Sequence, residues 1–138
     1  VFLSDYAHHP AEIAQSIRSV RELYPDKKIT GLFQPHLYTR TRDFYREFAD
    51  SLSLLDEVIL TEIYPAREEP IPGVSSRLIY DHLRPGIEKH LCPKAEVLDL
   101  LARKPVEVLM LLGAGDLDDY SPRIARLLEQ TGTHPTNS

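Results

Sequence analysis

The chain has 138 residues with a formal net charge of −5, and this length suits one domain with a hydrophobic core but is too short for two ordinary domains. The acidic balance argues against nucleic-acid binding, which needs a basic face, and no apolar run approaches the ~20 residues of a membrane-spanning helix. A single cysteine excludes an internal disulfide, so we expect a cytoplasmic protein with no nucleic-acid or membrane partner.

Apolar runs alternate with amphipathic segments through the first half of the chain. Residues 1–3 are predicted to form a short buried strand, and a helix is predicted from Pro10 to Tyr24 because proline suits a first helical turn. Residues 29–33 form the second predicted strand. A second helix is predicted from Thr41, and its apolar stripe is Phe44, Phe48, Leu52 and Leu55.

The second half of the chain is less regular. Residues 58–63 are the third predicted strand, and three prolines with one glycine make residues 64–73 a loop. Ser75 or Ser76 is placed to cap a short helix, and residues 106–112 form the most apolar predicted strand. The remaining predictions are a helix through residues 78–83, a short strand at 95–98, a helical turn at 99–104 and a final helix after 116.

This alternation predicts an α/β fold with a Rossmann-like, mostly parallel sheet flanked by helices on both faces, because parallel strands need crossover connections. We assign residues 1–130 to one such domain and expect the polar tail, residues 131–138, to be disordered. The chain begins inside a predicted strand and its only methionine is Met110, so we also expect a fragment of a longer protein.

Two polar clusters follow the first two predicted strands. The first is the run Asp-Tyr-Ala-His-His-Pro at 5–10, and the second is the run from Gln34 to Asp43. Ligands of open α/β sheets bind beyond the carboxyl ends of the strands. We therefore expect the two clusters to lie side by side and to form one site.

The first cluster carries Asp5, Tyr6, His8 and His9 at the start of a helix, where backbone N–H groups and the helix dipole favour an anion. A histidine there can act as donor, cation or base near neutral pH. Helix capping explains His9 as well as a functional role does. For Asp5, Tyr6 and His8 taken together, a functional role is the better explanation.

Arg40 and Arg42 lie just before or at the start of the second helix, where a cation gains nothing from the dipole. Their planar guanidinium groups suit a carboxylate or a phosphate, and only one of them is expected to point into the site. The alternative is a solvated basic turn that pairs with Asp43 and Glu47. His36 and Tyr38 have the same two interpretations.

Several catalytic patterns are absent from the sequence. It contains no G-x-x-x-x-G-K-[ST] phosphate loop, no H-E-x-x-H zinc pattern, no cysteine pair and no G-x-S-x-G elbow. We therefore predict no metal site. The run Gly-Ala-Gly-Asp at 113–116 lacks the third glycine of a dinucleotide fingerprint, so a tight turn is favoured over a phosphate cradle.

Four motifs in one order nevertheless resemble a known family. They are the run at 5–10, Phe-Gln-Pro-His at 33–36 with Tyr-Thr-Arg-Thr-Arg-Asp at 38–43, Ile-Tyr-Pro-Ala at 63–66 with Glu-Glu-Pro-Ile-Pro-Gly-Val-Ser-Ser at 68–76, and Gly-Ala-Gly-Asp at 113–116. Together they resemble the C-terminal domain of the Mur ligases, and among these the alanine-adding ligases. The resemblance extends to about Glu129.

The resemblance implies a three-domain parent that acts in peptidoglycan synthesis. Its N-terminal domain would hold UDP-N-acetylmuramate, and its central P-loop domain would hold ATP and magnesium (Mg2+). ATP would phosphorylate the muramoyl carboxylate, and the amine of L-alanine would then displace phosphate. The present chain would close over both partner domains and, alone, would be inactive.

The resemblance also implies roles for individual residues. Asp5 matches an acidic residue that helps to place the nucleotide, whereas Tyr6, His8, His36 and Arg40 match substrate-binding positions. Arg40 would clamp the carboxylate of alanine, and His8 and His36 would orient the amine or stabilise the departing phosphate, which makes these three the expected catalytic residues. Two positions depart from many relatives: Leu37 stands where they have arginine, and Arg67 stands where they have glycine.

Three alternatives stay open at this stage. The related ligase that attaches a recycled tripeptide to the same sugar shares the first cluster, but its second cluster differs. A metal-dependent hydrolase would use Asp5, His8, His9 and His36, although neighbouring histidines tend to point apart. A non-catalytic nucleotide-binding module is the third alternative.

Overall fold

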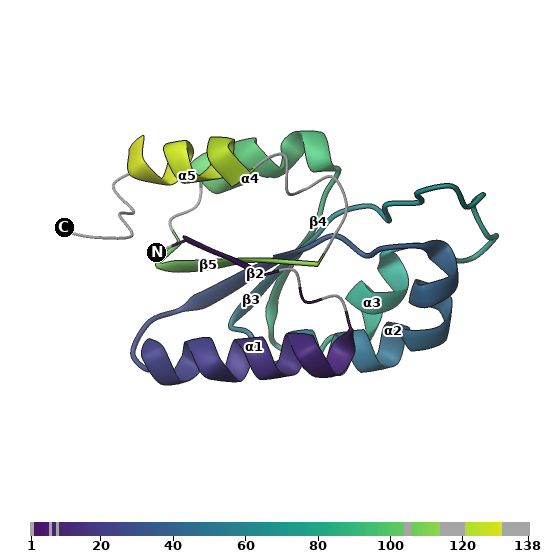
Figure 1. Ribbon diagram of the computed structural model, residues 1–138, viewed down its shortest axis with the longest axis horizontal. Coiled ribbons are helices and arrows are strands. Elements are labelled where there is room, and N and C mark those ends of the chain that lie inside the picture. Colours follow the sequence, from purple (N-terminus) through teal and green to yellow (C-terminus); the bar gives the residue numbers. More distant parts are fainter. Residues whose placement is uncertain (1, 6, 8, 104–105, 114–120, 131–138) are drawn as a thin grey trace.

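The computed structural model describes residues 2–5, 7, 9–103, 106–113 and 121–130. Five parallel strands form one sheet in the order β1-β5-β2-β3-β4 (Figure 1). This arrangement confirms the predicted α/β class, and within the described residues every strand pair is parallel. The strands are β1 (Phe2–Asp5), β2 (Ile29–Phe33), β3 (Glu57–Leu60), β4 (Glu88–Leu91) and β5 (Val108–Leu112).

Helices cover both faces of the sheet, as predicted. In Figure 1, α1, α2 and α3 lie below the sheet, and α4 and α5 lie above it. A short 3₁₀ helix, η1, leads directly into α4. The helices are α1 (Pro10–Leu23), α2 (Tyr38–Leu52), α3 (Arg77–His82), η1 (Lys94–Glu96), α4 (Val97–Arg103) and α5 (Ser121–Gln130). Among the described residues, none of the helices combines the length and the apolar character that crossing a bilayer requires.

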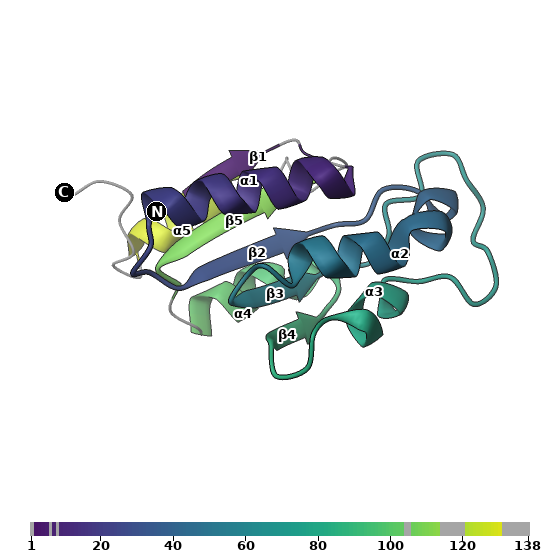
Figure 2. The ribbon, with the colours of Figure 1, turned by 90° about the horizontal axis from the view of Figure 1, so that it is seen from below.

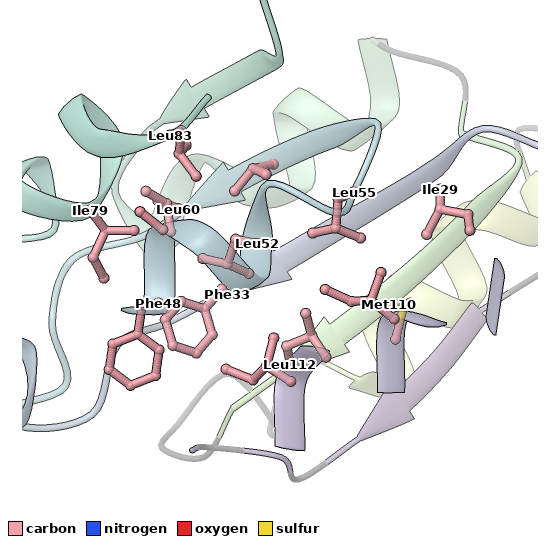
Figure 3. Close-up of a cluster of buried hydrophobic side chains, with 14 of the residues drawn as sticks. Ile29, Phe33, Phe48, Leu52, Leu55, Leu60, Ile79, Leu83, Met110 and Leu112 are labelled. Atoms are coloured by element: carbon pink, nitrogen blue, oxygen red, sulfur yellow. The ribbon is translucent and has the colours of Figure 1, made fainter. Parts of the chain in front are cut away.

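Side chains alternate between the two faces of the sheet and so build two cores. The larger core lies under α1, α2 and α3, where Phe33 of β2 packs against Phe48 of α2 with ring centroids 5.3 Å apart (Figure 3). Leu32 of β2 points the other way, into a smaller core under α4 and α5. Because the central strands are buried on both faces, they read as continuous apolar runs.

One predicted strand is wrong. Residues 95–98, expected as a strand, belong to η1 and the start of α4, and the fourth strand is instead Glu88–Leu91. Val97 and Leu101 are buried one helical turn apart, so these apolar residues form a helical stripe. The sequence of β4, Glu-Lys-His-Leu, is polar because β4 is an edge strand and is not fully buried.

The register aligns the carboxyl ends of all five strands. Asp5 of β1 and Phe33 of β2 both pair with Leu112 of β5, Phe33 pairs with Leu60, and Leu60 pairs with Leu91. The two polar clusters therefore follow strands that end at the same edge of the sheet. The strands that carry the clusters are not neighbours in the sheet, because β5 lies between β1 and β2.

Candidate functional site

The candidate site is built on this carboxyl edge of the sheet. In two perpendicular views, α2 extends beyond the ends of the strands, and the segment 61–76 runs around the far end of α2 (Figures 1 and 2). The edge thus carries the described part of the first cluster on one side and the second cluster on the other. Tyr6, His8 and residues 114–116 lie outside the described residues.

Asp5 holds the turn that leads from β1 into α1. Its Oδ1 accepts a hydrogen bond from the amide of Ala7 at 2.9 Å, and its Oδ2 accepts one from the hydroxyl of Ser16 at 2.5 Å. Each carboxylate oxygen has a second lone pair, so Asp5 can accept a further bond from a ligand. These two bonds tie the end of β1 to Ala7 and to α1.

His9 caps α1. Its Nδ1 accepts from the amide of Ala11, while the carboxylate of Glu12 accepts from the amide of His9, which completes a capping box. The hypothesis that His9 serves as a cap accounts for this geometry. The ring of His9 also lies 6.0 Å, centroid to centroid, from the ring of Phe44, so the start of α1 is placed beside α2.

The second cluster is tied to the loop after β3. The amide of Leu37 donates to the carbonyl of Tyr64 at 2.9 Å, and the amide of Tyr64 donates to the carbonyl of Pro35 at 2.8 Å. These bonds form an isolated parallel bridge between His36 and Tyr64, whose rings meet edge-on at 5.5 Å. The pairing of β2 with β3 is thereby resumed beyond the strands and holds His36 at the carboxyl edge.

Arg40 and Arg42 have different surroundings. Arg42 is exposed and pairs with Asp43 at 2.9 Å, and that hydrogen bond with the adjacent negative charge raises the pKa of Arg42. Arg40 is only partly exposed, and no side-chain hydrogen bond or ion pair links it to another described residue. It lies one helical turn before Phe44, on the side of α2 that faces the start of α1. The two arginines thus differ: Arg42 is paired on the surface, whereas Arg40 lies on the side of α2 that faces the start of α1.

Two shallow hollows open at the same edge. One, of about 290 Å³, lies between the β2 and β3 ends and η1, and its lining includes Gln34, Tyr64 and Lys94. The other, of about 240 Å³, is lined mostly by apolar atoms and includes Cys92. Burial, together with the charges of Glu96 and Glu62, raises the pKa of the Cys92 thiol, which is unfavourable for a nucleophile.

Gly113 ends β5 against the second cluster. Its φ of 91° lies in the left-handed region, and a β-carbon there would approach the carbonyl oxygen of Gln34 to 3.1 Å. The close approach explains the glycine at this position. It also brings the exit of β5 next to the Gln34–His36 segment.

The described residues include one group that could hold a metal, and it lies at the opposite end of the sheet. Glu57, Glu88 and His90 place their ligand atoms within 4.8 Å of one another. The ammonium of Lys28 lies 2.6 Å from Glu88 and 3.5 Å from Glu57, so a cation already balances these carboxylates. This group lies away from the two polar clusters.

Residues 1–117 match the family described as Mur ligase, glutamate ligase domain. The chain belongs to this family. The Mur ligase domain is 72% identical over 130 residues to a UDP-N-acetylmuramate–L-alanine ligase from Phocaeicola vulgatus, and 63% identical over 128 residues to one from Parabacteroides distasonis. It covers 94% and 93% of its own length in these matches but spans only about 28% of either relative.

Solved structures share the fold of this Mur ligase domain. The UDP-N-acetylmuramate–alanine ligase of Thermotoga maritima matches with a TM-score of 0.72 and 28% identity, over 94% of this chain and 27% of that one. A murein peptide ligase from Psychrobacter arcticus matches with a TM-score of 0.70 over 92% of this chain and 27% of that one. At 15% identity, this second likeness concerns the fold alone.

Sequence reasoning missed one contributor to the site. Glu68, in the proline-rich loop, accepts hydrogen bonds from Tyr38 and Thr39 at the start of α2. The hydrogen bond from Thr39, helped by two backbone amides and the charge of Arg42 and opposed by burial, lowers the pKa of Glu68. Local sequence carries no direct signal for this contact, because Glu68 lies about thirty residues from the helix start that it caps.

Proposed function

We propose that this Mur ligase domain is the C-terminal part of a longer ATP-dependent ligase that joins L-alanine to UDP-N-acetylmuramate in peptidoglycan synthesis. The observation that carries the proposal is the 72% identity to a relative of that name, over 94% of this chain. Because the chain spans about 28% of that relative, the remaining domains would supply the sites for the UDP-sugar, ATP and magnesium. The chain alone is expected to be inactive.

The residues of this domain would bind and orient alanine. Arg40 has the charge, the partial exposure and the position for a bidentate grip on the carboxylate of alanine. His36, fixed by its bridge to Tyr64, would orient the amine or stabilise the leaving phosphate. Tyr6 and His8 are proposed to complete this pocket, and Asp5 is proposed to contact the nucleotide through its remaining lone pairs.

Positioning is the main contribution that such a domain can make. Holding two reactants in register removes, at the ideal limit, about 7–11 kcal/mol from the barrier of their reaction. The carboxyl edge suits this task because its two polar clusters follow strands that end at the same edge of the sheet. The acyl phosphate itself would be formed by ATP, and this chain contains no phosphate loop for ATP.

The test is a ligation assay of the full-length protein with UDP-N-acetylmuramate, ATP and either L-alanine or the tripeptide L-alanyl-γ-D-glutamyl-meso-diaminopimelate. We expect ADP release and a product heavier by one alanyl residue with L-alanine, and a much slower reaction with the tripeptide. Preference for the tripeptide would assign the chain to the recycling ligase instead. Absence of ligation with both acceptors would overturn the proposal.

A further inference from the structure

Helix α2 begins without a cap from its own sequence. Leu37, at the N-cap position, has a φ of 71° and an apolar side chain, and the first turn of α2 contains no acidic residue. A helix start leaves backbone N–H groups that need acceptors. Arg40 adds positive charge at the end of the helix where the dipole is already positive. From local sequence alone, this helix start is unfavourable.

A carboxylate from the 64–73 loop supplies the missing cap. Glu68 Oε1 accepts from the amides of Tyr38 and Thr39 at 2.6 and 3.1 Å, and Glu68 Oε2 accepts from the hydroxyl of Thr39 at 2.5 Å. Glu68 thus satisfies two orphan N–H groups and one hydroxyl from a position about thirty residues away. The negative charge also offsets the positive end of the helix.

The loop that carries this carboxylate contains one residue in an unfavourable backbone conformation. Ala66 has a φ of 53°, in the left-handed region that residues with a side chain seldom occupy, and the amide of Glu68 donates to the carbonyl of Pro65 at 2.9 Å. Such strain persists where the surrounding contacts over-determine it, and it is common near ligand sites. The bridge between His36 and Tyr64 anchors the start of the same loop.

We propose that Glu68 is a positioning residue, which fixes the first turn of α2 and thereby holds Arg40 in place for the carboxylate of the amino-acid substrate. The loop of residues 64–73 and the start of α2 then act as one unit. The proposal rests on the proposed function, because it assigns Arg40 to alanine. Glu68 itself touches no substrate in this proposal; it acts through the helix that carries Arg40.

The experiment compares Glu68→Ala and Glu68→Gln with the matched control Glu69→Ala, all in the full-length protein. Glu69 is the adjacent residue, carries the same charge and is exposed. For Glu68→Ala we expect the KM for L-alanine to rise about tenfold, with the KM for ATP within about twofold of the wild type, because a small displacement of a binding group is costly. Glu68→Gln keeps an amide oxygen for the N–H groups and should restore most of the affinity for alanine.

Hydrogen exchange provides a readout that does not depend on turnover. The amides of Tyr38 and Thr39 should exchange about tenfold faster in Glu68→Ala than in the wild type, and at an unchanged rate in Glu69→Ala. Faster exchange with an unchanged KM for alanine would overturn the positioning role and leave only a structural cap. Unchanged exchange would overturn the cap itself.

The failure of the proposed function has a different signature. A wild-type protein that folds but does not ligate L-alanine would overturn the assignment of the reaction, and the positioning role with it, whatever the exchange rates show. An active wild type in which Glu68→Ala and Glu69→Ala have equal KM values for alanine would overturn only the role of Glu68.

Discussion

The ring of Phe44 on α2 lies 6.0 Å from the ring of His9 at the start of α1. This contact shows which side of α2 faces α1. Arg40 precedes Phe44 by one helical turn and therefore lies on the same side of the helix. Phe48 continues the row inward and is fully buried. Arg40 thus extends a core-facing stripe past the carboxyl edge of the sheet, where a ligand can take the place of apolar neighbours.

Replacing Arg40 by alanine should therefore weaken the binding of alanine selectively. We expect Arg40→Ala to raise the KM for L-alanine by about tenfold or more in the full-length protein, because a hydrogen bond to a charged group contributes about 1.5–3 kcal/mol. The KM for ATP should change less. Steady-state kinetics with each substrate varied in turn would measure both values.

Arg42→Ala is the matched control for this prediction. Arg42 lies two residues away but is exposed and paired with Asp43. Its removal should leave the KM for alanine within about twofold of the wild type, since exposed ion pairs contribute little. An equal rise of the alanine KM in both variants would contradict the assignment of Arg40.

A second prediction concerns stability at the opposite end of the sheet. Glu57 is fully buried, and it accepts from the hydroxyl of Thr30 at 2.9 Å and lies 2.8 Å from Nε2 of His90. Glu57→Ala should lower the free energy of unfolding by about 2–3 kcal/mol, because it leaves the buried hydroxyl of Thr30 without its acceptor and opens a cavity. Urea unfolding followed by circular dichroism would measure the change.

Glu88→Ala provides the comparison for Glu57, since Glu88 belongs to the same network but its side chain is 38% exposed. Its loss should cost less than about 1 kcal/mol, because water can replace the lost partner of Lys28. Equal costs for the two variants would show that burial does not govern this network.

Parts of the fold could be predicted from the sequence, and particular elements show which parts. Helix α1 was predicted to start at Pro10 with His9 as a candidate cap, and both features follow from local rules. The α/β class followed from the alternation of apolar and amphipathic segments. Strand β4 was missed because an edge strand with polar residues carries no apolar run.

The start of α2 shows the same limit at the candidate site. Local rules placed it at Thr41, but it begins at Tyr38, because its cap is Glu68 in a distant loop. Single-sequence reasoning has no local signal for such a partner. It identified two candidate arginines, but which of them faces the start of α1 depended on a tertiary contact, the one between His9 and Phe44.

A third prediction concerns the turn after β5. Gly113→Ala should lower the free energy of unfolding by about 1–3 kcal/mol or more, because its φ of 91° strains a residue with a side chain and its β-carbon would approach Gln34 to 3.1 Å. Gly86→Ala separates the two causes, since Gly86 has a φ of 84° but nothing within 4 Å of its β-carbon position. Thermal unfolding should rank Gly113→Ala as the more damaging; the reverse order would contradict the close contact.

A fourth prediction follows from the pKa of Asp56. This residue lies between α2 and β3, and its side chain contacts α1 and β2. Its Oδ2 accepts from Arg21 at 2.9 Å and from the amide of Ile29 at 2.8 Å. Burial acts to raise this pKa, but the hydrogen bonds and the neighbouring arginine charges outweigh it, so the pKa lies below its usual value. A carboxyl group with a depressed pKa stabilises the fold above its unfolded pKa, and that contribution disappears as the pH falls through the folded pKa.

Asp56→Asn should therefore be less stable than the wild type at pH 7, and the difference should shrink as the pH falls below about 4. Urea midpoints measured across this range would show the convergence. Asp50→Asn is the control, because Asp50 is exposed on α2 and has no ion pair with another described residue. Its difference from the wild type should stay small at every pH. A gap between Asp56→Asn and the wild type that persists in acid would mean that the side chain acts through its shape and not through its charge.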